Sequence, residues 1–314
     1  MDPRRPLLLR LSGDTMEHHV SRVDARCGEV NLFFFGDLQF GADGFVEEAW
    51  QDFRHEFKTT KNAYAIGLGD YGDWLRPTMR TKLYMSLTGD DSARRQLDSM
   101  VLKLQDQLLK KMDFLEGRLL GLHSGHHEHE WTSGGNSTQR LASGLKATYL
   151  GWVASTRLTM SFGKESKDST MTYTILSTHG SQNSRTTSGA AAAFERSYAE
   201  SFVVDQYVGG HGCKSDTWVS TERHTIRRQG SPGADLSVPR FMLVGGFCRG
   251  YTDGHSSSYV ERNSMKPQPV GWGLVNLKRC CNVEQARAEG KNPRTWVMRV
   301  TQSSRGPGIP FAPK

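Results

Sequence analysis

Few features of a secreted, membrane-bound or disulfide-stabilised protein occur in this sequence. No segment approaches the roughly 18 consecutive apolar residues that a membrane-spanning helix requires, so no membrane partner is expected. The run Leu7-Leu8-Leu9 is cut by Arg10 and Ser12, which leaves it too short for the apolar region of a signal peptide. The five cysteines form an odd set without a CxxC pair, which argues against a disulfide framework. A reducing cytoplasm is therefore the expected location.

The composition is that of a folded globular chain. Of its 314 residues, 36% are apolar and 23% are charged, which excludes a disordered, collagen-like or coiled-coil protein. No internal repeat or linker divides the chain. We predict an N-terminal arm over 1–28, a single domain over 29–301 and a Pro/Gly-rich tail over 302–314. A net charge of +7 favours, weakly, an anionic partner such as DNA or RNA.

Apolar runs alternate with helical patterns along the first two thirds of the chain, which is typical of α/β proteins. Strands are predicted at 31–35, 63–68, 119–122, 171–176, 203–208, 241–244 and 296–300. Helices are predicted at 44–58, 92–117, 137–155 and 190–201.

Five short motifs place an acid, an amide or an imidazole directly after an apolar run. They occupy 36–39, 69–73, 125–128, 178–180 and 210–213. Because ligands bind beyond the carboxyl ends of strands in open α/β sheets, we expect these five motifs to line one cleft. The side chains that would meet there are Asp37, Asp70, His126, His127, His179 and His211. Carboxylate and imidazole together suit Mn²⁺, Fe or Zn²⁺.

The order of these motifs resembles that of the calcineurin-like metallophosphoesterases. That family carries Asp-x-His, Gly-Asp-x-x-Asp, Gly-Asn-His-Asp/Glu, a lone His and Gly-His-x-His, and this chain has a counterpart of each across 36–213. The resemblance implies an α/β fold, a sandwich of two mixed β-sheets flanked by helices. It also implies one or two divalent metal ions, of which Mn is the first choice and Zn or Fe are alternatives.

The resemblance assigns roles to individual residues. Asp70 corresponds to the carboxylate that bridges the two metals, and Asp37 to the terminal carboxylate of the first metal. His179 and His211 correspond to the two histidines of the second metal. His127 corresponds to the histidine that meets the substrate phosphate and acts as general acid. The carboxylate of Glu128 would orient the His127 imidazole, whereas Asp73 is expected to orient a ligand or cap a turn.

Three positions depart from the family pattern. His126 stands where the family has a metal-binding asparagine, and imidazole is itself a good ligand. Gln39 and Cys213 stand where the first metal has histidines, so that site is expected to be weakened or retuned. Cys213 is either a thiolate ligand or a buried thiol. His123 and His129 are expected to lie outside the metal ligands.

The resemblance implies metal-assisted hydrolysis of a phosphoester substrate, in which a metal-activated water attacks phosphorus and His127 protonates the leaving oxygen. Three functions are compatible with the motifs. The first is a phosphodiesterase or nuclease acting on DNA or RNA, which the basic balance favours. The second is a small-molecule or protein phosphatase, and the third is a non-catalytic phosphoesterase-like binding scaffold. Compact relatives with altered first motifs occur in bacteria and phages, so a phage-encoded protein acting in the host cytoplasm is one alternative. The oligomeric state is left open.

Overall fold

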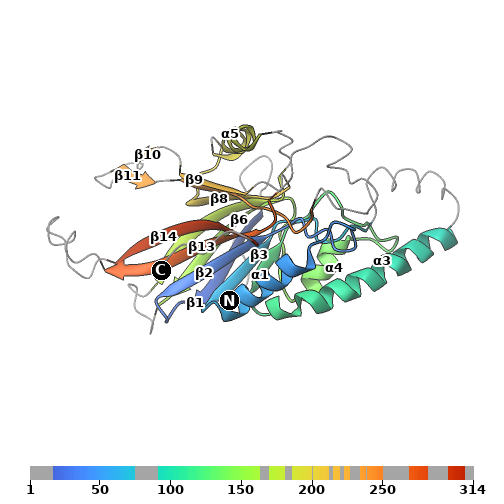
Figure 1. Ribbon diagram of the computed structural model, residues 1–314. Helices are drawn as coiled ribbons and strands as arrows, with labels where there is room; N and C mark the ends of the chain where they lie inside the picture. The colour runs from blue at the N-terminus through green and yellow to red at the C-terminus, as the bar shows by residue number, and fades with distance from the viewer. Residues whose placement is uncertain are drawn as a thin grey trace, which may run out of the picture.

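The structure, a computed structural model, describes residues 17–74, 91–162, 170–180, 186–199, 201–211, 215–219, 223–226, 234–237, 239–249, 269–281 and 296–307. Two six-stranded sheets, here called sheet A and sheet B, form the body of the molecule (Figure 1). A separate two-stranded hairpin consists of β10 (Arg223–Ile226) and β11 (Ala234–Ser237). In the described part of the chain, no helix has the length and apolar character needed to cross a membrane.

Sheet B joins the first strands of the domain to the last ones. Its order is β14 (Trp296–Arg305), β13 (Trp272–Cys281), β2 (Glu29–Phe35), β3 (Ala63–Gly67), β4 (Leu119–Leu122) and β5 (Thr148–Tyr149). Strands β2 to β5 run parallel, so their carboxyl ends lie at one end of the sheet. Strand β13 pairs antiparallel with both β2 and β14. The C-terminal third of the chain thus completes a sheet that the N-terminal third begins.

Sheet A is mixed as well. Its order is β1 (Glu17–Asp24), β6 (Val153–Ser161), β7 (Thr170–Thr178), β8 (Gln206–Gly209), β12 (Arg240–Leu243) and β9 (Asp216–Val219). Strands β7, β8 and β12 run parallel, whereas β6 and β9 are antiparallel to β7 and β12. Strand β1 lies within the segment predicted as an N-terminal arm, and β14 extends to Arg305, within the predicted tail.

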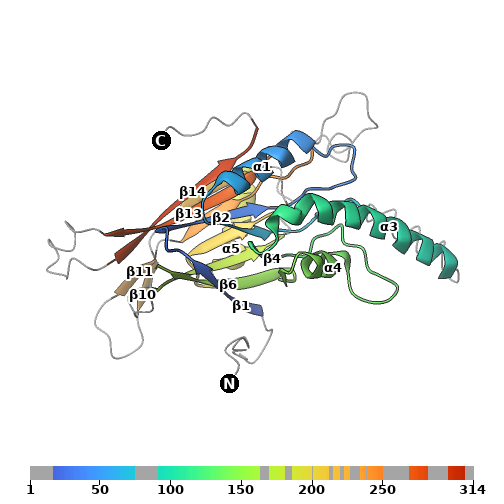
Figure 2. The same cartoon turned by 90° about the horizontal axis from the view of Figure 1, so that it is seen from below.

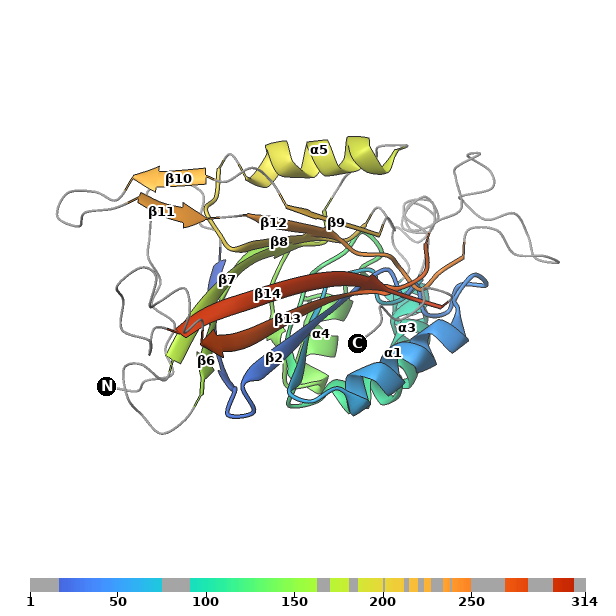
Figure 3. The ribbon, with the colours of Figure 1, turned by 60° about the vertical axis from the view of Figure 1, so that its left-hand side comes forward.

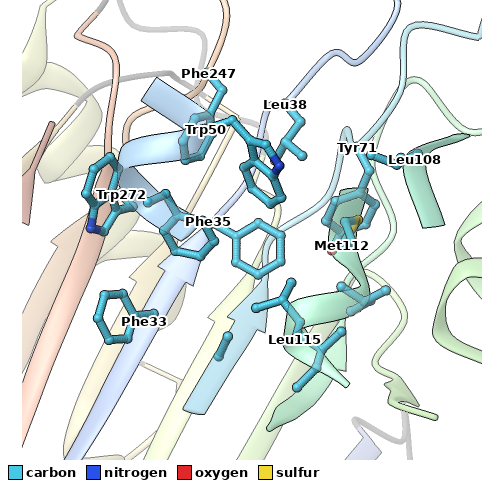
Figure 4. Close-up of a cluster of buried hydrophobic side chains, with 14 of the residues drawn as sticks. Phe33, Phe35, Leu38, Trp50, Tyr71, Leu108, Met112, Leu115, Phe247 and Trp272 are labelled. Carbon is cyan, nitrogen blue, oxygen red and sulfur yellow. The ribbon is translucent and has the colours of Figure 1, made fainter. Parts of the chain in front are cut away.

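The residues of β2 show how the sequence builds the sandwich. Leu32 and Phe34 lie in the core cluster between the two sheets, together with residues of β6 and β7. Phe33 and Phe35 lie in the cluster on the opposite face, under the helices (Figure 4). Successive side chains of a strand alternate between faces, and a strand covered on both faces is apolar throughout. The unbroken apolar run at 32–35 follows from this double burial.

Helices cover the outer faces of both sheets. Sheet B is covered by α1 (Glu47–Thr59), α3 (Asp91–Met112) and α4 (Ser137–Gly144), as Figure 2 shows for α1 and α3. Helix α1 buries Trp50, Phe53 and Phe57 on one face, and the Phe57 ring lies 5.3 Å from that of Phe33. Helix α5 (Thr187–Tyr198) lies on sheet A and buries Phe194 (Figure 3). Two mixed sheets flanked by helices confirm the predicted fold class.

Some predicted helix boundaries are wrong. The helix predicted over 137–155 ends at Gly144, because the backbone at Lys146 and Gly151 has φ values of 54° and 61° that no helix accommodates. The rest of that segment forms β5 and the start of β6. The helix predicted from 44 begins at Glu47, since Phe45 forms a bridge with Cys248. The helix predicted to 117 ends at Met112 and is followed by a 3₁₀ turn, η1 (Asp113–Leu115).

Candidate metal centre

The site is assembled from the carboxyl ends of strands in both sheets. In sheet B, Asp37, Asp70 and His126 follow the parallel strands β2, β3 and β4. In sheet A, His179 and His211 follow the parallel strands β7 and β8. This is the end of an α/β sheet at which ligands bind.

The backbone is strained where it presents these side chains. Asp37, Gln39, Asp70 and His211 have φ values of 48°, 50°, 54° and 62°, in the left-handed region that residues other than glycine rarely adopt. Backbone hydrogen bonds hold the turns in place. The N–H of Asp37 donates to the carbonyl of Gly69 at 2.9 Å, and the N–H of Gln39 donates to the carbonyl of Asp70 at 3.0 Å. Strain of this kind, about 1–3 kcal/mol per residue, persists where the surrounding structure enforces it and gathers at functional sites.

Four of the predicted ligands form a compact cluster. Asp70, His126, His179 and His211 each offer one ligand atom, and these atoms all lie within 4.8 Å of one another. The ring centroids of His126 and His211 are 4.2 Å apart, and each lies 4.9 Å from that of His179. One carboxylate with three imidazoles is a donor set suited to a divalent transition metal. The residues present could therefore hold a divalent metal ion.

Asp70 and His179 form a buried ion pair at the centre of the cluster. Nε2 of His179 lies 3.3 Å from Oδ2 of Asp70. Burial alone would raise the pKa of Asp70, but His179 and His127 outweigh it and hold that pKa below its usual range. Burial likewise lowers the pKa of His179, but the carboxylates of Asp70 and Asp37 outweigh it and raise that pKa to about 9.

The orientation of the His179 ring is fixed by a backbone carbonyl. Nδ1 of His179 lies 2.7 Å from the carbonyl oxygen of Leu68, which can only accept, so Nδ1 carries a proton and Nε2 faces Asp70. Nδ1 of His211 lies 3.2 Å from the same Nε2 atom. Burial and the neighbouring His179 lower the pKa of His211 to about 4, so its imidazole is neutral near pH 7 and able to bind a metal.

Asp37 and Gln39, which the resemblance assigns to the first metal, lie beside the cluster. Oδ2 of Asp37 accepts a hydrogen bond from the backbone N–H of His211 at 3.0 Å. Burial, opposed by His179 and reinforced by Asp70, raises the pKa of Asp37 to about 6. Nε2 of Gln39 donates to Oδ2 of Asp70 at 3.3 Å, so the amide nitrogen faces the carboxylate. Cys213 lies outside the described residues.

His127 lies next to the cluster and is held by two acids. Its backbone N–H donates to Oδ1 of Asp70 at 2.9 Å, and its Nε2 lies 3.9 Å from Oδ2 of Asp70. Its Nδ1 lies 3.3 Å from Oδ1 of Asp73. Glu128, which was predicted to orient this ring, has a different hydrogen-bond partner. Oε2 of Glu128 accepts a hydrogen bond from Nδ2 of Asn136 at 3.1 Å.

The other two histidines of this segment, His123 and His129, form hydrogen bonds with residues outside the cluster. Nε2 of His123 lies 2.7 Å from the hydroxyl of Ser177, and its Nδ1 lies 3.0 Å from the carbonyl of Gly151. Nε2 of His129 lies 2.7 Å from Oδ1 of Asp98. Burial lowers the pKa of His123 to about 3, so this imidazole is neutral in the folded chain.

Sequence reasoning missed two side chains near the site. The ring of Trp152 lies 5.1 Å from that of His126 and 6.2 Å from that of His179. Burial, with the charges of Asp73 and Asp37, raises the pKa of the Cys248 thiol to about 12. Cys248 follows β12 by way of Gly245-Gly246, so an apolar strand running into glycines was the available signal. Trp152 has no such signal, because only the folded chain brings it to the histidines.

Comparison with known proteins gives distant structural likenesses. No protein-family model and no curated protein matches the chain. The structure of a Vps29 mutant from Entamoeba histolytica aligns with 88% of this chain and 100% of its own, at 11% identity and a TM-score of 0.34. Vps29 from Cryptosporidium parvum covers 88% and 99%, at 11% identity and a TM-score of 0.34. A predicted phosphoesterase from Streptococcus pneumoniae covers 88% and 98%, at 9% identity and a TM-score of 0.30. At such values the likeness assigns no function.

Proposed function

We propose that this chain is a metal-dependent phosphoester hydrolase of the calcineurin-like type that acts on phosphodiesters. The observation that carries the proposal is the cluster of Asp70 with three imidazoles, whose ligand atoms all lie within 4.8 Å of one another. His127 lies beside this cluster without belonging to it. A metal-binding group next to a separate proton donor is what metal-assisted ester hydrolysis requires.

The metal would be held by this chain's own residues. Asp70, His126, His179 and His211 supply one site, and Asp37 and Gln39, with Cys213, supply the donors of a second, weaker one that shares Asp70. A bound divalent cation, Mn²⁺ in first place, lowers the pKa of bound water and neutralises charge on phosphoryl oxygens. The hydrogen bond from the His211 N–H to Asp37 keeps the two sets of donors together.

His127 is the proposed proton donor to the leaving oxygen. Its side chain is 24% exposed, so it can reach a substrate, whereas Asp70 and His179 are buried. Oδ1 of Asp73 accepts a hydrogen bond from the protonated Nδ1 of His127. This bond keeps the proton on Nδ1 and sets the direction of the ring. The hydrogen bond from the His127 N–H to Asp70 fixes the loop relative to the cluster.

DNA or RNA is the proposed partner, in the cytoplasm. The net charge of +7 attracts polyanions and favours a phosphodiester in a nucleic acid over a small monoester. A small-molecule or protein phosphatase is the competing enzyme.

The test compares bis(para-nitrophenyl) phosphate with para-nitrophenyl phosphate, with and without Mn²⁺, on the full chain. Metal analysis of the same preparation measures occupancy. Mn²⁺-dependent diester hydrolysis that Asp70→Asn abolishes supports the proposal. Asp106→Asn is the matched control, since that exposed carboxylate pairs with Arg140 away from the cluster. Preference for the monoester would support a phosphatase. A folded protein that binds metal and hydrolyses neither ester would support a non-catalytic scaffold and overturn the proposal.

A further inference from the structure

One exposed aromatic side chain lies beside the metal cluster. Among the large apolar side chains that are exposed in the described residues, Trp152 is the aromatic one, with 48% of its surface exposed. Its ring meets those of His126 and His179 at interplanar angles of 67° and 60°. An indole exposed to this extent loses the benefit of burial, and the hydrolytic chemistry described above does not use it.

The backbone around Trp152 is tied to the strand ends that carry the site. The carbonyl of Trp152 accepts a hydrogen bond from the hydroxyl of Thr178 at 2.9 Å, directly before His179. The carbonyl of Gly151 accepts from the N–H of Ser124, the second residue after β4, at 2.8 Å. Trp152 is therefore anchored to the loops of both sheets rather than carried on a free segment.

Space is open on the side of Gly151. Apart from its two chain neighbours, no residue has an atom within 4 Å of a Cβ atom added at this glycine. The indole is fixed through its backbone and keeps 48% of its surface exposed, as suits a preorganised binding surface.

We propose that Trp152 is a stacking platform for a nucleobase of the substrate, so that the ester cleaved belongs to a nucleotide or to single-stranded nucleic acid. The inference rests on the proposed function and names its substrate class. A base is joined to its phosphate through one sugar, which fits an indole lying 5.1 Å and 6.2 Å from two of the clustered imidazoles. Base stacking on an aromatic side chain is sequence-tolerant and contributes substantially to single-strand binding.

A protein partner is less well supported by this surface. Protein interfaces use contiguous apolar patches of several hundred Å². Trp152 instead adjoins Gly151 in the chain and the imidazole of His126 in space. A π-face beside a cluster that would hold a phosphate matches a nucleotide better than an apolar peptide.

The test measures selectivity for a base. Thymidine para-nitrophenyl phosphate is compared with the para-nitrophenyl ester of base-free deoxyribose phosphate, which has the same leaving group. The ratio of kcat/KM for the two esters should fall by about fivefold or more in Trp152→Ala and recover in Trp152→Phe. Val203→Ala, which removes another exposed apolar side chain, is the control and should leave the ratio unchanged.

A binding measurement separates this inference from the proposed function. Thymidine monophosphate should quench tryptophan fluorescence of the parent protein, and the quenching should be lost in Trp152→Phe. Base-free deoxyribose phosphate should quench neither. Hydrolysis of neither ester would defeat the proposed function, while the quenching data would still decide the role of Trp152. Equal loss of activity on both esters in Trp152→Ala, or quenching that survives in Trp152→Phe, would overturn the inference.

Discussion

The backbone N–H of His211 donates a hydrogen bond to Oδ2 of Asp37, although 174 residues separate them. His211 follows β8 of sheet A, and Asp37 follows β2 of sheet B. The bond therefore connects the two sheets at the end where the imidazoles gather. Because the acceptor is a buried carboxyl group, the bond also satisfies a polar atom that would otherwise be costly to bury.

Asp70→Asn should lower Mn²⁺-dependent hydrolysis at least about 100-fold, because the carboxylate charge is central to the cluster and an amide oxygen is a poor ligand. The protein should remain folded, since asparagine has the same shape and can still accept from the His127 N–H. Hydrolysis rates and circular dichroism measure the two effects. Activity within a few-fold of the parent would remove Asp70 from the metal centre.

His127→Ala should leave the metal content unchanged and lower turnover by about 10²–10⁴-fold, as for a lost general acid. The defect should shrink on a substrate with a nitrophenolate leaving group, because that oxygen departs without a proton. Metal analysis and rates on good and poor leaving groups test both statements. Loss of metal together with a uniform defect would make His127 a ligand instead.

Asp73→Asn should lower turnover at least about tenfold through the His127 ring, because Asp73 is the acid that lies beside Nδ1. Glu128→Gln should affect turnover less, since the Glu128 carboxylate bonds to Asn136. The Asp73→Asn defect should depend on the leaving group as that of His127→Ala does. Rates of the two variants on the same ester pair decide the matter, and a larger loss in Glu128→Gln would restore the role that the sequence predicted for it.

The purified protein should hold nearer one tightly bound metal than two, because Gln39 and Cys213 replace imidazole at the first site. Gln39 also points its amide nitrogen at Asp70. Restoring both histidines, in Gln39→His with Cys213→His, should raise the occupancy. Elemental analysis after dialysis gives the count, and two tight metals in the parent chain would contradict this expectation.

His123 should make the metal-free protein sensitive to acid. Its folded pKa of about 3 lies below the ordinary value of 6.5, so the unfolded chain binds the proton first. The free energy of unfolding should then fall as the pH drops from about 6.5 towards 3, by at most about 1.4 kcal/mol per pH unit from this group. His123→Gln should remove that share of the slope in urea unfolding at several pH values. The exposed His18→Gln is the control, and equal slopes in both variants would contradict the prediction.

The strands and their terminal acids could be predicted because their signals are local. An apolar run that ends in Gly36-Asp37 or Gly69-Asp70 needs no distant information to be recognised as a buried strand and a turn. The pairing of β13 with β2 could not be predicted, since it joins residues from opposite ends of the domain.

Within the candidate site, too, local features could be predicted from the sequence, whereas contacts between distant residues could not. The motif order predicted that the candidate ligands follow strand ends, and they do so in the structure, but it does not say where the neighbouring side chains point. Asp73 rather than Glu128 lies beside the His127 ring because of how the loop turns. Trp152 reaches the histidines because the chain leaves the predicted helix after Gly144 and re-enters sheet A as β6.

Because the chain is synthesised from its N-terminus, the late position of β13 in the sequence determines when β2 can pair with it. Asn31 of β2 and Asn276 of β13 are hydrogen bonded across 245 residues, so β2 lacks this neighbour until β13 has left the ribosome. During that time an apolar strand has an unpaired edge, the kind of edge that recruits wrong partners. A chain that stops before residue 272 would carry every proposed catalytic residue and still lack the strand that covers β2. Premature termination would therefore yield an aggregating product rather than a shorter enzyme.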